Sequence, residues 1–94
     1  MGKEKQLTPD EQQFMEHLGV AIFYYRKKVR YTQKQLAEQA GITVASVGRI
    51  ERGDAAPSVV VLYRLTKAMG IELQKLFIFM EMRWNWLKST SERE

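Results

Sequence analysis

The chain has 94 residues, a formal net charge of +4 and no cysteine, which together indicate one domain without disulfides or thiol chemistry. From this length we expect no separate ligand-sensing domain. The N-terminal segment is polar, and charges interrupt the most apolar segment, residues 73–87, so we expect no signal peptide, no membrane span and a cytoplasmic location.

The first predicted element is a helix that begins after Thr8. Glu11 stands three residues later, which makes a capping box, and Pro9 suits the first helical position. The helix is predicted to end near Arg30, and the only histidine of the chain, His17, is interpreted as a surface residue on it. Its buried stripe is made up of Phe14, Leu18, Ala21, Ile22, Tyr25 and Val29.

Residues 32–53 predict two short helices joined by a tight turn. Thr32 and Gln35 form a second capping box, and Gly41 ends the helix that they start. Thr43 is the cap of the next helix, which Gly53 closes. Two helices joined by such a turn make a helix-turn-helix, in which the second helix can lie in the major groove of DNA.

A helical wheel separates the two sides of this second helix. If Val47 and Ile50 face the core, the outward and flanking positions are Val44, Ala45, Ser46, Gly48, Arg49 and Arg52. Arg49 is able to bind the O6 and N7 atoms of a guanine with two hydrogen bonds. Arg52 lies one turn later and is predicted to contact a phosphate. Any DNA contact from Thr43 is secondary to its role as a cap.

The apolar outward positions predict a different kind of contact. Val44 and Ala45 have no side-chain hydrogen-bonding group, but either can pack on the methyl group of a thymine. Gly48 either permits close approach of the helix to DNA or is unconstrained because this helix reads bases poorly. Both interpretations of Gly48 remain open.

Positive charge is concentrated in the same part of the chain. Residues 26–52 carry a net charge of +5, whereas the rest of the chain sums to −1. A basic patch on a helix-turn-helix is typical of a phosphate-binding face, and we expect Lys27, Lys28 and Lys34 to contribute to it. A solvated surface is the alternative explanation.

Two further helices are predicted after Gly53. Pro57 and Ser58 begin one that runs to Met69, and Gly70 ends it. The last helix is predicted over residues 72–88, followed by disorder over residues 89–94. One apolar stripe of this helix can face the core, made up of Leu73, Leu76, Phe77, Met80, Trp84 and Leu87.

A second stripe of the last helix needs another partner. It consists of Phe79, Met82 and Trp86, for which we predict a homodimer interface. The alternative is that the helix folds back over the first helix, near Phe23 and Tyr24, and completes a monomer.

From Leu18 to Phe77 the sequence resembles the DNA-binding domain of the Cro and phage-repressor (XRE) family. The matching positions are Leu18-Gly19, Arg26, Thr32-Gln33, Leu36-Ala37, Gly41, Ile50-Glu51-Arg52-Gly53, Pro57-Ser58, Leu62, Leu65, Met69-Gly70-Ile71 and Leu76. The resemblance implies an all-α, compact five-helix domain, here extended at its C-terminal helix over residues 72–88. With the length of the chain, we expect a single domain over residues 1–94. It also implies a structural ion pair between Arg26 and Glu51 and a phosphate contact by Gln33. Many relatives carry glycine where Arg30 stands, which leaves an extended Arg30 as an alternative ending for the first helix.

The resemblance further implies a function. We expect a transcriptional regulator that binds double-stranded DNA sequence-selectively, as a repressor and homodimer on a palindromic operator. The alternative is a protein-interaction module, such as the antitoxin of a toxin–antitoxin pair, that grips a small protein partner and binds DNA secondarily. Without a cysteine, a second histidine or a phosphate-binding loop, we expect no metal, no cofactor and no enzymatic activity.

Overall fold

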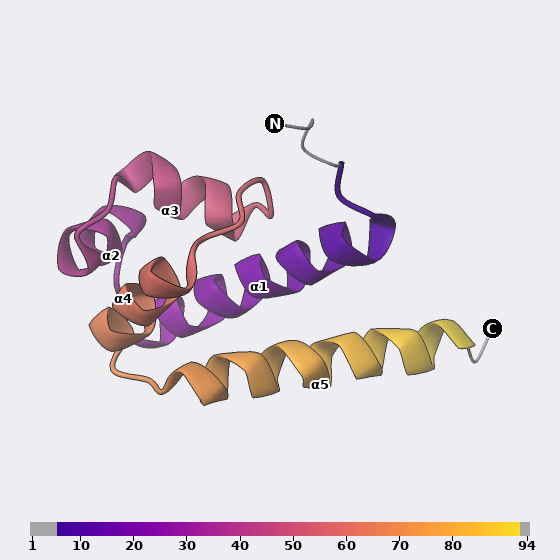
Figure 1. The fold of residues 1–94 in the computed structure, drawn as a ribbon. Coiled ribbons are helices and arrows are strands. Elements are labelled where there is room, and N and C mark those ends of the chain that lie inside the picture. Colours follow the sequence, from indigo (N-terminus) through magenta and orange to yellow (C-terminus); the bar gives the residue numbers. More distant parts are fainter. Residues whose placement is uncertain (1–5, 93–94) are drawn as a thin grey trace.

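The computed structural model describes residues 6–92, which form five helices and no strand (Figure 1). In chain order these are α1 (Pro9–Lys28), α2 (Gln33–Ala40), α3 (Val44–Glu51), α4 (Val59–Met69) and α5 (Leu73–Glu92). Helices α2, α3 and α4 gather around the C-terminal half of α1, while α5 returns along α1 (Figure 1). The all-α prediction is confirmed. None of these helices is long and apolar enough to cross a membrane.

The helix starts follow from the predicted caps. The Thr8 hydroxyl accepts the Glu11 amide at 3.1 Å, and the Glu11 carboxylate accepts the Thr8 amide at 2.9 Å, which completes the capping box. Thr32 and Gln35 repeat this arrangement at the start of α2. Thr43 and Ser58 cap α3 and α4. Each cap contributes about 1 kcal/mol, so the polar residues fix where the helices begin.

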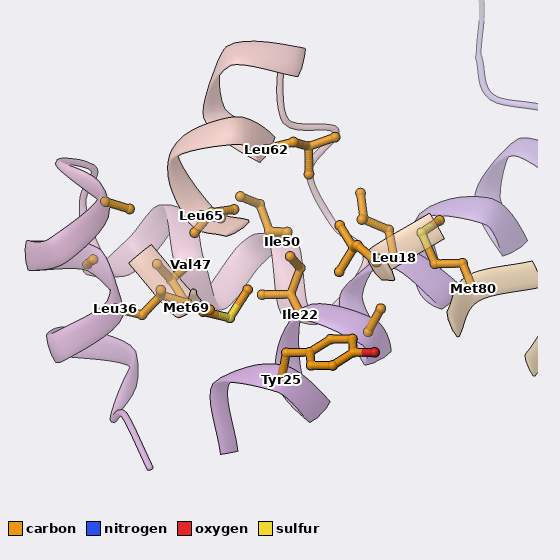
Figure 2. Packing of buried hydrophobic residues seen from close by; sticks show 14 residues of the cluster. Leu18, Ile22, Tyr25, Leu36, Val47, Ile50, Leu62, Leu65, Met69 and Met80 are labelled. Carbon is orange, nitrogen blue, oxygen red and sulfur yellow. The ribbon is translucent and has the colours of Figure 1, made fainter. Parts of the chain in front are cut away.

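The core lies where α1, α3 and α4 meet (Figure 2). Ile22 of α1, Val47 of α3 and Leu65 of α4 are completely buried, and Leu36 and Leu76 join them from α2 and α5. Burying each such side chain contributes about 1.5–3 kcal/mol. Because this cluster includes residues of α3, the outer side of that helix has a fixed orientation.

Four helices end in the same way. After each of α1, α2, α3 and α4, a residue with positive φ is followed by an amide that donates to a carbonyl five residues earlier. Glycine occupies the positive-φ position three times, whereas Arg30 occupies it after α1, with φ +63°. The extended alternative for Arg30 is therefore wrong. A left-handed arginine is destabilising by roughly 1–2 kcal/mol relative to its usual conformation.

Phe14 and the end of α5 also differ from prediction. Phe14 is 47% exposed rather than buried, because α1 and α5 leave a hollow that Phe14 and Trp84 line from either side. Helix α5 continues to Glu92, so disorder from residue 89 is wrong for residues 89–92. The Thr90 hydroxyl donates to the carbonyl of Trp86 at 2.9 Å, which satisfies a backbone acceptor near the helix end. Residues 93–94 lie outside the described part of the chain.

His17 is buried, contrary to its interpretation as a surface residue. Its ring stacks on Trp84 with centroids 4.8 Å apart, and Arg83 Nη1 lies 2.7 Å from His17 Nδ1. The guanidinium can only donate, so Nδ1 accepts and the imidazole is neutral. Burial and, to a lesser extent, the Arg83 charge hold the pKa of His17 below its ordinary 6.5, while Glu16 opposes them. The sequence did not reveal that α5 would cover this position.

We predict that stability falls when His17 is protonated. Because its pKa is lowered in the folded chain, its contribution is fully present above about pH 6.5 and is lost as the pH falls through that lowered pKa. Urea unfolding of the chain and of His17→Gln should be compared at neutral and mildly acidic pH. In acid, the wild type should lose more free energy of unfolding than His17→Gln does. An equal loss in both proteins would contradict this role.

Candidate nucleic-acid interface

Helix α3 has one side in the core and the other in solvent. Val47 and Ile50 belong to the buried cluster, as the helical wheel predicted (Figure 2). On the other side Val44 is 44% exposed, and Ala45 and Arg49 are exposed as well. Among residues 6–92, no ion pair engages Arg49. Its guanidinium is therefore available to a ligand.

The start of α3 is fixed by Thr43. The Thr43 hydroxyl accepts the Ser46 amide at 3.0 Å and donates to the Ser46 hydroxyl at 2.8 Å. Ser46 is half-buried, whereas Thr43 is exposed. Both hydroxyls thus hold the cap together. The Thr43 hydroxyl keeps only a lone pair for a further contact, whereas the Ser46 hydroxyl can still donate its proton, for example to a phosphate.

Gly48 is buried, although the helical wheel placed it on the side of α3 that faces away from the core. A Cβ at Gly48 would lie 3.2 Å from Nη1 of Arg52 and 3.6 Å from Oε1 of Gln33, so these two side chains cover the position. The predicted outward direction of Gly48 did not include this cover. Arg52 pairs with Asp54 at 3.2 Å, and both side chains are largely exposed. The bare backbone at Gly48 therefore leaves room for Arg52 and Gln33 to lie against α3.

A buried ion pair joins the end of α1 to the end of α3. Arg26 donates from Nε and Nη2 to the two carboxylate oxygens of Glu51, at 2.6 and 3.0 Å. Two further hydrogen bonds extend the pair: Arg26 Nη1 donates to the Tyr31 carbonyl at 2.8 Å, and Gln33 Nε2 donates to Glu51 at 2.9 Å. The two charged side chains are only 8% and 6% exposed. This network fixes the start of α2 relative to α3.

The predicted basic residues divide into two groups. Lys27 and Lys34 line a shallow depression at the start of α2, together with Arg30. Gln33 lines the same depression and also covers Gly48, so the depression adjoins α3. Lys28 is elsewhere: its ammonium lies 5.5 Å from the centroid of the Tyr24 ring, on the side of α1 that faces α5. The candidate face therefore contains Lys27 and Lys34 but not Lys28.

Two features of this face were missed in the sequence. Arg30 was counted in the basic window but was not predicted to contact DNA, although it lines the depression. Gly19 matched a family position, but its role was not assigned: it lies directly against the carbonyl groups at the end of α3. The departure from glycine at Arg30 was the available signal for the first feature, whereas nothing in the sequence indicated the second.

Helix α5 presents a separate apolar surface. Phe79 packs within its own chain, with its ring centroid 4.7 Å from that of Tyr24 and 5.7 Å from that of Tyr25. Helix α5 thus folds back over α1, as the monomer alternative predicted for this residue. Met82 and Trp86 are nevertheless 67% and 66% exposed. Of the three predicted interface residues, only these two are freely available to another chain.

A family model described as helix-turn-helix matches residues 22–76, more than half of the chain. An uncharacterised HTH-type transcriptional regulator of Methanothermobacter thermautotrophicus is 34% identical over 58 residues, which cover 61% of this chain and 84% of that protein. The HTH-type transcriptional regulator DicA of Escherichia coli is 38% identical over 52 residues, covering 55% of this chain and 38% of DicA.

Solved structures agree with this assignment. The restriction-modification controller protein C.AhdI of Aeromonas hydrophila is 29% identical, with a TM-score of 0.65 over 66% of this chain and 94% of that protein. The clp gene regulator ClgR of Corynebacterium glutamicum shares the fold with a TM-score of 0.80 at 22% identity, over 84% of each chain. The chain therefore belongs to the helix-turn-helix family of the Cro and phage-repressor type, a family of DNA-binding transcriptional regulators.

Proposed function

We propose that this chain binds double-stranded DNA sequence-selectively through α3 and represses transcription by occupying a promoter. The observation that carries the proposal is the amphipathic α3, whose apolar side is locked in the core while Arg49 stands free on the opposite side. A rigidly anchored helix can present the same side chains to every base pair that it scans. The adjacent depression lined by Lys27 and Lys34 supplies positive charge beside it.

The side chains divide into base-reading and phosphate-binding groups. Arg49 is assigned to a guanine, a contact that discriminates by about 1–3 kcal/mol, and Val44 and Ala45 to thymine methyl groups. Lys27, Lys34 and Arg52 are assigned to phosphates, which hold the register without reading sequence. Gln33 contributes through its backbone amide at the start of α2, because its side chain is engaged with Glu51.

Mutation of the two groups is expected to have different effects. Duplexes enriched by the purified chain from genomic fragments should be compared with scrambled duplexes at two salt concentrations. We expect Arg49→Ala to reduce the difference in binding free energy between the enriched and the scrambled duplexes by about 1–3 kcal/mol. Lys27→Ala should weaken binding to both kinds of duplex equally and make the salt dependence of binding shallower. Lys88→Ala, an exposed lysine near the end of α5, is the control and should change neither quantity. The absence of any enriched sequence would contradict the proposal.

The exposed side of α5 supports a homodimer as the binding form. Ile78, Met82 and Trp86 are four residues apart and 45%, 67% and 66% exposed, which makes one apolar stripe along the helix. Symmetric dimers are the commonest oligomers, and two α3 helices about 34 Å apart would read half-sites of a palindrome about 10 bp apart. The same stripe would serve a small protein partner if the chain were an antitoxin, which is the second candidate function.

We predict that charge on this stripe produces a monomer. Sedimentation of the wild type at micromolar concentration should give twice the 11.0 kDa mass of one chain, and Trp86→Glu should give the mass of one chain. Val60→Glu is the matched control, because Val60 is 59% exposed on α4 and away from the stripe. A wild type that sediments as a single chain would contradict the dimer and favour a different partner on α5.

A further inference from the structure

Arg30 has a left-handed backbone conformation that glycine adopts at the ends of α2, α3 and α4. The four helices α1 to α4 end with the same hydrogen bond, from Tyr31 to Arg26, Ile42 to Ala37, Asp54 to Arg49 and Ile71 to Thr66, at 2.8–3.1 Å. The left-handed residue before each donor is Gly41, Gly53 or Gly70 in three of them, with φ near +75°, and Arg30 in the fourth. Glycine adopts this conformation without steric conflict and arginine does not. Folding alone therefore favours glycine at position 30.

The residues that line the depression around Arg30 include cations and no carboxylate. It lines the depression at the start of α2 together with Arg26, Lys27, Tyr31, Thr32, Gln33 and Lys34. Arg26 is neutralised by Glu51, whereas the ion pairs within residues 6–92 include none of Arg30, Lys27 and Lys34. The positive charges of Arg30, Lys27 and Lys34 around this depression repel each other, so an anion bound among them is stabilised by all three.

The position of the depression indicates which kind of anion it would bind. Gln33 lines it and also covers Gly48 of α3, so a ligand bound there lies beside the surface assigned to the groove. A duplex with α3 in its major groove carries its backbone phosphates along both rims of that groove. Arginine is suited to such a phosphate, because its planar guanidinium can donate two parallel hydrogen bonds.

We propose that Arg30, with Lys27 and Lys34, clamps one backbone phosphate of the bound duplex, and that this contact retains an arginine where folding favours glycine. The clamp rests on the proposed function, because it requires α3 to bind DNA. It adds affinity without sequence information. If the clamp exists, replacing Arg30 with glycine should raise the stability of the folded chain and lower its affinity for DNA.

Arg30→Gly separates these two effects. The variant should unfold at a higher urea concentration than the wild type, because the left-handed strain is removed. It should bind both the enriched and the scrambled duplex about eightfold more weakly at about 0.1 M salt, with a log–log salt slope smaller by about 0.9, which is the contribution of one phosphate contact. A side chain that only complements the dipole of α1 would leave the salt slope unchanged.

Two further variants make the result specific. Arg30→Lys keeps the charge and should retain the salt slope. Lys88→Gln removes one charge in the C-terminal part of α5 and should change neither slope nor affinity. An unchanged slope in Arg30→Gly overturns the clamp alone, whereas failure of the wild type to bind any duplex overturns the proposed function and the clamp together.

Discussion

Glu51→Ala should destabilise the folded chain by about 3–5 kcal/mol. The substitution leaves the Arg26 guanidinium buried at the junction of α1 and α3 without its two carboxylate acceptors. It also removes the acceptor of Gln33. A domain with a total stability of about 5–15 kcal/mol would lose much of it, and the midpoint of chemical denaturation measures the loss.

A matched control exists in the same chain. Arg52 and Asp54 also form an ion pair, but their side chains are 64% and 59% exposed, so Asp54→Ala should change stability by only about 0–1 kcal/mol. Arg26→Lys should also be strongly destabilising, because a lysine cannot donate to two carboxylate oxygens and the Tyr31 carbonyl in the same planar geometry. Equal effects of Glu51→Ala and Asp54→Ala would show that burial does not determine the strength of this pair.

Gly19→Ala should destabilise the chain by about 3 kcal/mol, although alanine favours helices more than glycine does. A Cβ at position 19 would collide with the carbonyl oxygen of Glu51 and would lie 2.6 Å from that of Ile50. Both obstacles are backbone atoms of α3, which cannot rotate away as a side chain can. To make room, α1 and α3 would have to separate, and the Arg26–Glu51 pair spans the same contact.

Gly48→Ala is the control for this prediction. Gly48 is also a buried glycine within a helix, but its nearest obstacle, at 3.2 Å, is the flexible end of Arg52. Alanine should therefore be neutral or stabilising by up to about 1 kcal/mol at this position. Thermal unfolding of the two variants should give shifts of opposite sign or very different size. Similar losses in both would indicate that the close approach of α1 to α3 does not limit position 19.

The sequence was sufficient to predict where α1 to α4 begin because each of these starts has a local chemical cause. Thr8, Thr32, Thr43 and Ser58 cap the helices that follow them, and these caps depend on residues only three positions apart. Periodicity likewise identified Val47 and Ile50 as the inner side of α3. Predictions of this kind need no knowledge of how distant parts of the chain meet.

The errors at His17, Phe14 and Gly48 concern contacts between different helices. His17 and Phe14 lie on one helix, but whether each is buried depends on the path of α5, which covers His17 with Trp84 and leaves Phe14 open. The cover over Gly48 was not predicted, because a helical wheel contains no information about Gln33, which reaches over it from α2. The periodicity of one helix cannot show which side chains of another helix will lie over it.

The central claim is that the outer side of α3 and the depression beside it form the DNA-binding face. The most direct test is an NMR titration of the isotope-labelled chain with an enriched duplex, followed through the amide and arginine side-chain signals. We predict that the largest shifts occur from Thr43 to Arg52, at Arg30 and at the start of α2, with little change along α5 beyond Met82. Shifts concentrated on α5, with the Arg49 signal unmoved, would contradict the claim.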